Sequence, residues 1–373
     1  MPVQKKKRSK TKASRSENSK NKDKHKEEKK FQVNHSSPKK KEALHIGKIA
    51  PLNILEQQTL FFNTNCLINP ILLYPEGSNL IGYTEKFQPH NQYLNAAISI
   101  LENGLLDYKS ESNFYQSECS NLSQSETLEE FQVYLDTLGI RNTVEIIFSP
   151  SAIAPTAVTH NPKTLVSQIT VGLPISYCKE RIQGAMNHEI GTHLLRTLNE
   201  RKQIWYKKRD KYGLGAYIET EEGLASLHTM LDSAFSGRRK PYLWRAALHY
   251  YSSYYASMCS FVELYQRLER YMDDPVKRFK EVLRVKRGIS NTELPGGCYK
   301  DQVYLSGAIK ILQRRKDIDF FKLYCGKLSL EDLFRQEILD LCDLSDIKFP
   351  IFLRDIQKYK QALDFIAKTN GVE

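Results

Sequence analysis

The chain has 373 residues, of which 40% are apolar, so it is long enough to bury a core of enzyme size. Its formal charge of +12 lies in residues 1–48, which hold 17 Lys and Arg against 5 Asp and Glu, whereas residues 49–373 hold 38 of each sign. No apolar run reaches membrane-spanning length, no signal peptide is recognisable, and the seven cysteines are widely spaced without a CxxC pair. These features argue against membrane-spanning proteins, disulfide frameworks and thiolate zinc sites, and they favour a reducing cytoplasm.

Residues 1–48 are rich in Lys, and Phe31 is their only large aromatic residue. Such a stretch buries too little apolar surface to offset the entropy of ordering, so we expect a disordered basic tail followed by one catalytic domain over residues 49–373. The positive charge would attract an acidic partner such as a microtubule, a nucleic acid or an anionic membrane. The run from Lys5 to Lys10 also has the character of a nuclear-localisation signal.

The first half of the chain predicts a few separate helices and strands. We expect a helix over residues 89–102, ended by Asn103 and Gly104, and a mobile Ser-rich loop over residues 110–127. Thr127 and Glu130 have the spacing of a capping box, which predicts a helix from there to residue 138. Strands are expected over residues 144–148 and 165–173. The second strand is either an edge strand that pairs with a substrate backbone or an interior strand.

The second half of the chain favours helix almost without interruption. The expected helices cover residues 179–198, 221–235, 241–271, 275–285, 300–315 and 330–341. Strands, then a helix with a metal-binding motif, then further helices indicate an α+β architecture with a small sheet and a mostly helical second half.

The metal-binding motif is His188-Glu189-Ile-Gly-Thr-His193, inside the first of these helices. Imidazole nitrogens are good zinc ligands, and a catalytic zinc needs three protein ligands and one open position. The two histidines are five residues apart, however, so a regular α-helix of about 3.6 residues per turn would point them away from each other. A single π-type turn would bring them to one side, and Gly191 would ease that distortion. The alternative is an exposed helix with two histidines and no metal.

A third ligand is expected from a downstream acidic stretch that contains Glu219, Glu221 and Glu222 at the start of another helix. One of these carboxylates would complete the site, and Glu189 would then be free to act as the base toward a water activated by zinc. That division of roles is typical of peptide hydrolysis. The alternative is that all three carboxylates only match the dipole of a helix N-terminus.

Three blocks in this order resemble the HExxxH metallopeptidases that include the microtubule-associated tyrosine carboxypeptidases and bacterial proteins with a Gln-Glu-Gly-Leu-Ala motif. The blocks are residues 188–193, Glu-Glu-Gly-Leu-Ala at 221–225 and Lys-Asp-Gln-Val-Tyr-Leu at 300–305, with Leu-Trp-Arg-Ala-Ala at 243–247 between the last two. The resemblance implies a gluzincin-like metallopeptidase in which His188, His193 and Glu222 bind Zn²⁺. Glu189 would be its catalytic carboxylate. Glu222 is preferred over Glu221 because the bacterial motif has Gln at the position of Glu221.

For eukaryotic members, the resemblance implies removal of the C-terminal tyrosine from the acidic tail of α-tubulin, which is detyrosination of microtubules. A carboxypeptidase must hold a free carboxylate, so Lys300, Tyr304 and Arg287 are candidate substrate-binding residues. The alternative for each of them is an ordinary solvated charge or a packing residue. The resemblance covers roughly residues 165–315 and does not extend to residues 1–48.

Two other functions stay open on the sequence alone. One is a zinc peptidase that acts on another protein substrate, as a bacterial-type member would. The other is a cytoskeleton-binding or nucleic-acid-binding protein that works through its basic tail and has a structural metal site.

Overall fold

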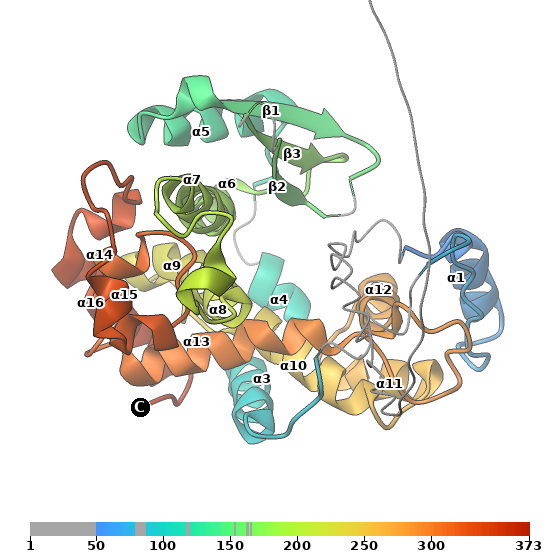
Figure 1. Cartoon of the computed structure of the whole chain (residues 1–373). Helices are drawn as coiled ribbons and strands as arrows, with labels where there is room; N and C mark the ends of the chain where they lie inside the picture. Colours follow the sequence, from blue (N-terminus) through green and yellow to red (C-terminus); the bar gives the residue numbers. More distant parts are fainter. Residues whose placement is uncertain (1–49, 79–86, 117–119, 153, 162–163, 165) are drawn as a thin grey trace, which may run out of the picture. The chain divides into compact units, whose positions relative to one another are not determined.

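The computed structural model describes residues 50–78, 87–116, 120–152, 154–161, 164 and 166–373. The expected basic tail over residues 1–48 lies outside the described residues. Within them, a small sheet is followed along the chain by a mostly helical second half, which confirms the α+β prediction (Figure 1). No helix in the described ranges is both long enough and apolar enough to cross a membrane.

The helices fall into three groups along the chain. The first group is α1 (Ile54–Asn63), α3 (Leu94–Tyr108), α4 (Glu111–Gln116) and α5 (Gln124–Thr137). The motif segment consists of α6 (Lys179–His188), a π-helical turn (Glu189–Leu194) and α7 (Leu195–Glu200). The last group is α8 (Ile218–Thr229), α9 (Leu231–Ser236), α10 (Trp244–Ala256), α11 (Phe261–Arg267), α12 (Pro275–Lys286), α13 (Val303–Arg314), α14 (Phe320–Leu323), α15 (Gln336–Leu339) and α16 (Ile356–Thr369).

The sheet has three strands, β1 (Val144–Ser149), β2 (Thr156–His160) and β3 (Ser167–Gly172), in the order β1-β3-β2. Ile169 of β3 faces Ile146 of the parallel β1 on one side and Val158 of the antiparallel β2 on the other. Both predicted strands are confirmed, but β3 is interior, so it is not an edge strand that could pair with a substrate. Strand β2 was not predicted, because its five residues are too few for a clear alternating pattern.

The motif segment lies between the sheet and the helices α8 and α13 (Figure 1). Strand β2 contacts the π-helical turn, α6 packs on α8, and α8 packs on α13. The crossing of α8 and α13 is unusually close, because Gly223 and Gly307 face each other and a methyl group on either would collide with the backbone of the other helix. This close approach sets the position of α8, and therefore of its acidic residues, relative to α13.

Two predictions for the first half are wrong in their boundaries. Helix α3 runs past Asn103 and Gly104 to Tyr108, because Gly104 is the residue that lets the helix approach Trp244: a Cβ there would lie 2.5 Å from the indole ring. The predicted capping box at Thr127 is replaced by one at Ser123, whose side chain accepts from the backbone N–H of Glu126.

The expected loop over residues 110–127 is therefore wrong where the structure describes it. Helix α4 occupies Glu111–Gln116, and the first turn of α5 begins at Gln124. Tertiary packing overrides the polar composition, because Phe114 stacks on Trp244 with ring centroids 5.5 Å apart and Glu111 is buried.

In the second half the predicted helices are confirmed, with interruptions that the pattern did not show. The helix expected over residues 241–271 is divided into α10 and α11 by a turn, at which Ser260 caps α11 through Glu263. Residues 330–341 form only a 3₁₀ turn and the short α15. The amphipathic C-terminal helix α16 was not predicted; its buried face includes Tyr359, Leu363 and Ile366.

The cysteines differ in one respect from expectation. Cys66, Cys259, Cys325 and Cys342 are free thiols. Cys178 is disulfide-bonded, which its spacing in the sequence did not predict.

Candidate metal centre

The motif histidines lie where α6 passes into α7 through the π-helical turn Glu189–Leu194. The wider turn offsets the five-residue spacing, so that the rings of His188 and His193 have centroids 5.0 Å apart. The π-type turn expected from the spacing is therefore confirmed.

Hydrogen bonds from side chains hold the wide turn in place. The hydroxyl of Thr192 donates to the carbonyl of Asn187, five residues back, at 2.9 Å, and it accepts from His228 Nδ1 at 2.6 Å. The other ring nitrogen of His228 then accepts from the hydroxyl of Tyr359 at 2.9 Å. Tyr324 donates to the carbonyl of Gly191 at 2.6 Å. Burial lowers the pKa of His228 well below its usual value, which agrees with the neutral ring that this chain of bonds requires.

Gly191 is required at its position for a steric reason. A Cβ there would lie 2.8 Å from the hydroxyl oxygen of Tyr134 and 3.0 Å from the ring of Phe352. The glycine thus allows the turn to pack against α5 and the C-terminal segment as well as to widen.

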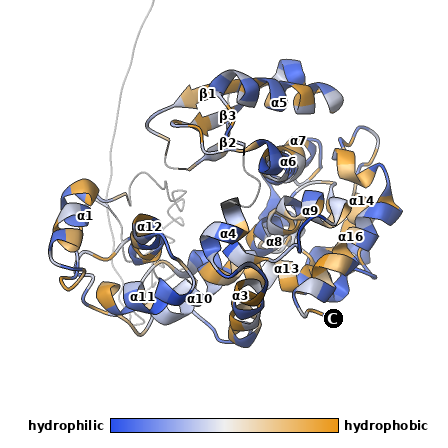
Figure 2. Ribbon diagram, turned by 180° about the vertical axis from the view of Figure 1, so that it is seen from behind, coloured by the Kyte–Doolittle hydropathy of each residue, from blue (hydrophilic) through white to orange (hydrophobic). Residues whose placement is uncertain are grey.

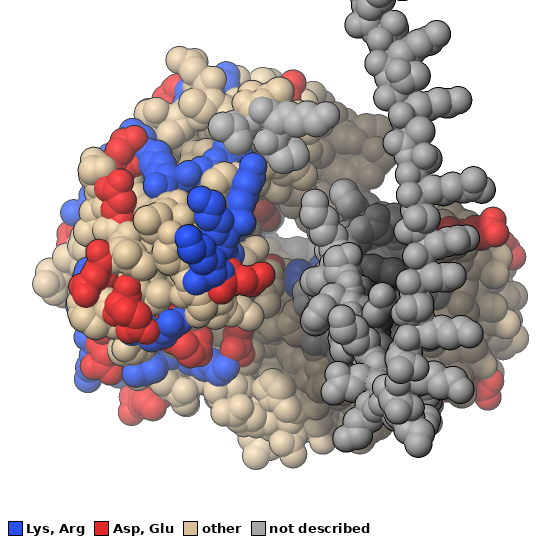
Figure 3. Space-filling view, viewed as in Figure 1, with Lys and Arg blue, Asp and Glu red and all other residues tan. Residues whose placement is uncertain are grey.

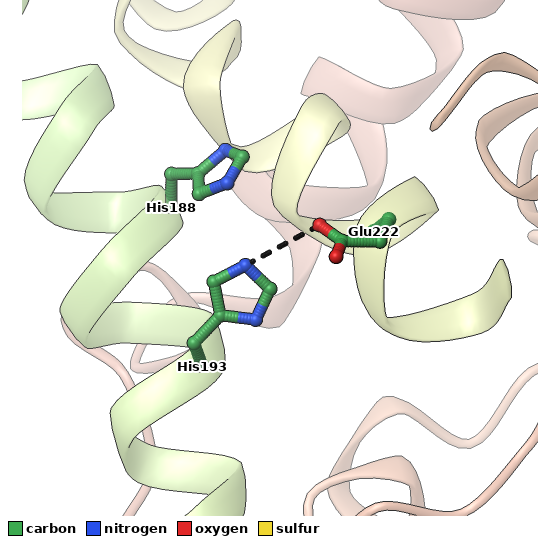
Figure 4. Close-up of side chains that lie close together, drawn as sticks. All are labelled: His188, His193 and Glu222. Carbon is green, nitrogen blue, oxygen red and sulfur yellow. Dashed lines mark ion pairs between the residues drawn. The ribbon is translucent and has the colours of Figure 1, made fainter. Parts of the chain in front are cut away.

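Glu222, on α8, points toward the two histidines (Figure 4). One potential ligand atom from each of His188, His193 and Glu222 lies within 4.8 Å of the other two. His193 Nε2 and Glu222 Oε2 are 3.6 Å apart, close to the roughly 3.4 Å expected when two ligand atoms lie about 2.1 Å from a tetrahedral zinc. Two imidazoles and one carboxylate are also a donor set of catalytic zinc sites, so these residues fit the ion in both chemistry and spacing.

Hydrogen bonds at the far ring nitrogens set which nitrogen of each histidine is available. The hydroxyl of Thr229 donates to the carbonyl of Ala225 and therefore accepts from His188 Nδ1, 3.0 Å away. The carboxylate of Glu221 accepts from His193 Nδ1, also at 3.0 Å. Both Nδ1 atoms thus carry the proton, and both Nε2 atoms keep a free lone pair for a metal.

Glu221 is held as a charged carboxylate by two cations. Lys327 Nζ lies 3.0 Å from its Oε1, and the buried guanidinium of Arg196 donates to its Oε2. Burial alone would raise the pKa of Glu221, but Lys327 and Arg196 lower it well below the usual range. Arg196 also donates to the carbonyls of Gly326 and Leu328, so it ties the segment that carries Lys327 to α7.

Glu189 lies beside the cluster without being part of it. Its Oε1 is 4.0 Å from His188 Nε2, and its side chain keeps 19% of its exposure. Desolvation raises the pKa of Glu189 to about 7, with a further rise from the charge of Glu222. A carboxylate with a pKa near neutrality can both accept and return a proton, which is what a general base in hydrolysis must do.

The three predicted substrate-binding residues are placed differently from one another. Lys300 Nζ lies 3.7 Å from Glu222 Oε1, so the structure brings it to the cluster. Burial raises the pKa of Tyr304 well above its usual value, with a further rise from Glu222, so its hydroxyl stays protonated in the electrostatic field of the cluster. Arg287 is turned toward Asp301, 3.9 Å away, and is not brought to the candidate ligands.

The residues that hydrogen-bond to the candidate ligands from behind were not predicted. Thr229 was not singled out, and Glu221 was weighed only as a third ligand or as a match for the helix dipole, although their positions on the same helix as Glu222 are a usable signal. Arg196 follows His193 by three residues and so lies on the same face of the motif helix, which is a second signal. Nothing in the sequence marks Lys327, which comes from a segment more than 100 residues downstream.

Comparison with known proteins shows the family to which the chain belongs. Residues 79–371 match the family model described as microtubule-associated tyrosine carboxypeptidase, a range that holds every residue of the candidate metal centre. The chain belongs to the microtubule-associated tyrosine carboxypeptidase family. This confirms the predicted family and the predicted enzyme class, since carboxypeptidases are hydrolases.

Individual members of the microtubule-associated tyrosine carboxypeptidase family match along most of the chain. Microtubule-associated tyrosine carboxypeptidase 1 of Mus musculus is 31% identical over 350 residues, which cover 92% of this chain and 72% of that protein. The Rattus norvegicus protein of the same name is 32% identical over 331 residues, which cover 87% of this chain and 68% of that protein. A solved structure from Colwellia psychrerythraea aligns with a TM-score of 0.45 at 12% identity, over 86% of this chain and 60% of that one. A likeness at that level carries no argument about the fold.

Proposed function

We propose that the chain is a zinc-dependent carboxypeptidase that removes a C-terminal tyrosine from a protein, and that this protein is α-tubulin. The observation that carries the proposal is the convergence of His188, His193 and Glu222 within 4.8 Å of one another, with Glu189 beside them. The tyrosine and the microtubule come from the names of the relatives. A cytoplasmic, microtubule-associated location follows from that substrate, and nuclear localisation is the alternative raised by the basic N-terminus.

The chain's own residues supply the proton transfers of the reaction. A zinc ion held by the three ligands would polarise the scissile carbonyl and acidify a water molecule. Glu189 accepts the proton of the attacking water and returns it to the amine of the departing tyrosine. The partial exposure of Glu189 and of both histidines leaves the cluster open on one side to a peptide end.

Lys300 is the residue best placed to recognise the free carboxylate of the substrate. Its Nζ lies next to the ligand Glu222, and its side chain is 28% exposed. An ammonium group so close to the reacting centre would bind a C-terminal carboxylate one residue from the bond to be cut. Tyr304 follows one helical turn later and adds a hydroxyl donor on the same face.

Strand β2 is the element best placed to hold the substrate backbone. It is an edge strand and contacts the π-helical turn. The bonds from Gly172 N–H to the Pro155 carbonyl and from Asn161 N–H to the Val166 carbonyl show which residues face β3. By the alternation of an antiparallel pair, the N–H and C=O of Val158 and His160 face the open edge. An extended peptide can add to that edge by β-augmentation.

A basic segment next to the centre fits the acidic character of a tubulin tail. Residues 201–211 link α7 to α8 and contain six Lys and Arg against one Asp, and Lys202, Lys207, Lys208 and Lys211 are exposed. Figure 3 shows Lys and Arg side chains gathered over this part of the molecule, next to a hollow. A surface of this charge attracts an acidic peptide and raises its local concentration.

Release of terminal residues from a matched peptide set tests the proposed function. The peptides share an acidic sequence and end in tyrosine, phenylalanine, alanine or tyrosine amide. We expect release of the free-acid tyrosine, little release of alanine, none of the amide, loss of activity with a zinc chelator and recovery on adding zinc. Cleavage of the amide or within the peptide would contradict a carboxypeptidase, and full activity after removal of all metal would contradict the zinc site. Activity only on unrelated sequences would favour a zinc peptidase with another substrate.

A further inference from the structure

Residues 50–75 form a part of the surface with almost no charge. Glu56 is the single charged residue among them. Seven large apolar side chains in this segment are between 44% and 81% exposed. These seven, which we call the α1 patch, are Leu52, Leu55, Leu60, Leu67, Ile68, Ile71 and Leu73. Figure 2 shows apolar stretches, coloured orange, on and around α1.

Hydrogen bonds between two chain segments hold the residues of the α1 patch in place. The backbone N–H of Leu52 donates to the carbonyl of Leu73 at 2.7 Å, and the Asn53 side chain bonds to the backbone of both Ile71 and Leu73. The buried side chain of Gln57 accepts from the N–H of Ile71 at 2.8 Å. These bonds hold the exposed residues of two chain segments side by side.

The inner face of α1 anchors this surface in the core. The ring of Phe61 packs against Phe261, Tyr265 and Phe279 at centroid distances of 4.8–5.3 Å. The inner face of α1 is packed against the core through Phe61, whereas Leu55 points outward. Leu55 is 81% exposed and has no packing role within the described residues.

Single exposed leucines are common on protein surfaces, but seven large exposed apolar side chains in one short segment are not. Soluble surfaces usually have roughly a quarter to a third of charged residues, whereas this segment has one charge in 26 residues. A surface of this composition is typical of a protein interface.

The sequence next to the patch indicates the chemistry of the partner. The segment 1–48, with 17 Lys and Arg against 5 Asp and Glu, ends four residues before Leu52. A partner that meets both would have to be acidic and also present an apolar contact, as the surface of a folded acidic protein does. We propose that the α1 patch is a docking surface for the acidic face of a protein polymer, namely the microtubule lattice. This inference rests on the proposed function for the identity of the polymer.

The docking surface is separate from the metal centre. None of the candidate ligands, Glu189 or Lys300 belongs to it, and the match to the family model begins at residue 79, after the patch ends. Variants in the patch should therefore change attachment to the polymer without changing hydrolysis of a free peptide.

Co-sedimentation with stabilised microtubules tests the docking surface. The full-length chain with Leu55→Ser and Ile71→Ser is compared with wild type and with the matched control Leu106→Ser, which changes a leucine that is 69% exposed on α3. Burial of a leucine contributes about 1.5–3 kcal/mol, so the double variant should bind microtubules at least about tenfold more weakly. The control should bind like wild type, and all three should release tyrosine from a free peptide at equal rates.

Other outcomes would overturn the proposal in distinguishable ways. Unchanged microtubule binding of the double variant, or equal weakening by Leu106→Ser, would show that the patch is not a docking surface. A wild-type dimer that becomes a monomer in the double variant would assign the patch to a second copy of the chain. Loss of sedimentation with phosphatidylserine vesicles, while microtubule binding stays, would assign it to a membrane. Because sedimentation measures binding alone, failure of the proposed peptidase activity would not imitate any of these results.

Discussion

Glu221 and Glu222 are neighbours in the sequence but lie on different sides of His193. Glu222 Oε2 is 3.6 Å from Nε2 of that ring, and Glu221 Oε1 is 3.0 Å from Nδ1. A helical step of about 100° separates the two carboxylates, and this places one at the candidate metal and the other behind the ligand. The resemblance selected Glu222 as the ligand, and the geometry is consistent with that choice while giving Glu221 a separate role.

We expect Glu221→Gln to weaken zinc binding without abolishing it. The amide still accepts from His193 Nδ1, but it lacks the negative charge that makes the imidazole a stronger ligand, and such changes weaken metal affinity by about 10–100-fold. Competition with a calibrated chelator measures the zinc dissociation constant directly. Glu219→Gln is the control, because Glu219 pairs with Lys310 at 2.5 Å and should leave the affinity unchanged. Equal zinc affinity in both variants would refute a positioning role for Glu221.

Glu111 gives a prediction about pH and stability that does not involve the metal. Burial raises the pKa of Glu111 from 4.5 to about 7, so folding favours its protonated form. The stabilisation is complete below pH 4.5 and is lost as pH rises through 7. Glu111→Gln should therefore raise the free energy of unfolding at pH 8 by at most about 3 kcal/mol, which a higher melting temperature would reveal. At pH 4.5 the substitution should change the melting temperature little. A larger gain at pH 4.5 than at pH 8 would contradict this assignment.

At the scale of single elements, the sequence predicts those features that local chemistry determines. The five-residue spacing of His188 and His193, with Gly191 between them, predicted the π-helical turn because no regular helix could bring both rings together. Positions decided by distant contacts were not predictable. Thr127 was expected to cap the N-terminus of a helix, but Ser123 forms the cap. Gly104 was expected to end a helix, but the helix continues past it because Gly104 packs against Trp244, which lies 140 residues away in the sequence.

In the candidate site too, features set by neighbouring residues could be predicted, whereas features set by distant contacts could not. The candidate ligands could be found because two are on one helix and the third is near the start of another, in a recognisable block. Lys327 could not, since its relation to Glu221 depends on the fold of the C-terminal third. Strand β2 was missed because its pairing with β3, and not a pattern of its own, makes it a strand.

The crossing of α8 and α13 should tolerate no added volume. A methyl at Gly307 would collide with the carbonyl oxygen of Glu219 and displace α8, which carries Glu222. We expect Gly307→Ala to lower the unfolding free energy by about 1–3 kcal/mol and to weaken zinc binding. Ser306→Ala is the control on the same helix, because the buried hydroxyl of Ser306 has no hydrogen-bond partner in the described structure. Denaturant unfolding and chelator competition give the two readouts, and an unchanged zinc affinity in a folded Gly307→Ala would contradict the positioning of Glu222 by this contact.

The open edge of β2 can be tested with one position and two substitutions. Val158→Pro removes an N–H that faces away from β3, and Val158→Ala shortens the same side chain but keeps that N–H. If a substrate pairs with this edge, the proline variant should raise KM for a tyrosine-ended peptide by roughly three- to tenfold over the alanine variant, the size of one hydrogen bond. Identical KM values for the two variants would place the substrate backbone elsewhere.

For the molecule as a whole, we propose that the candidate metal centre catalyses hydrolysis and that the α1 patch attaches the chain to the microtubule. The centre lies between the sheet and the helices α8 and α13, and the patch lies at α1, in residues that the family model does not reach. Catalysis and attachment should therefore be separable by mutation. A chain that lost both with a single surface variant would have to be organised differently.

The central claim is that Glu189 is the base of a zinc peptidase, and one variant tests it directly. Glu189→Gln preserves the shape of the side chain and all three ligands, so zinc content measured by elemental analysis should stay at one ion per chain. Release of tyrosine from an acidic tail peptide should fall by about 10²–10⁴-fold in kcat, since the amide cannot accept the proton of water. A Glu189→Gln chain that keeps its zinc and still releases tyrosine at the wild-type rate would contradict the account.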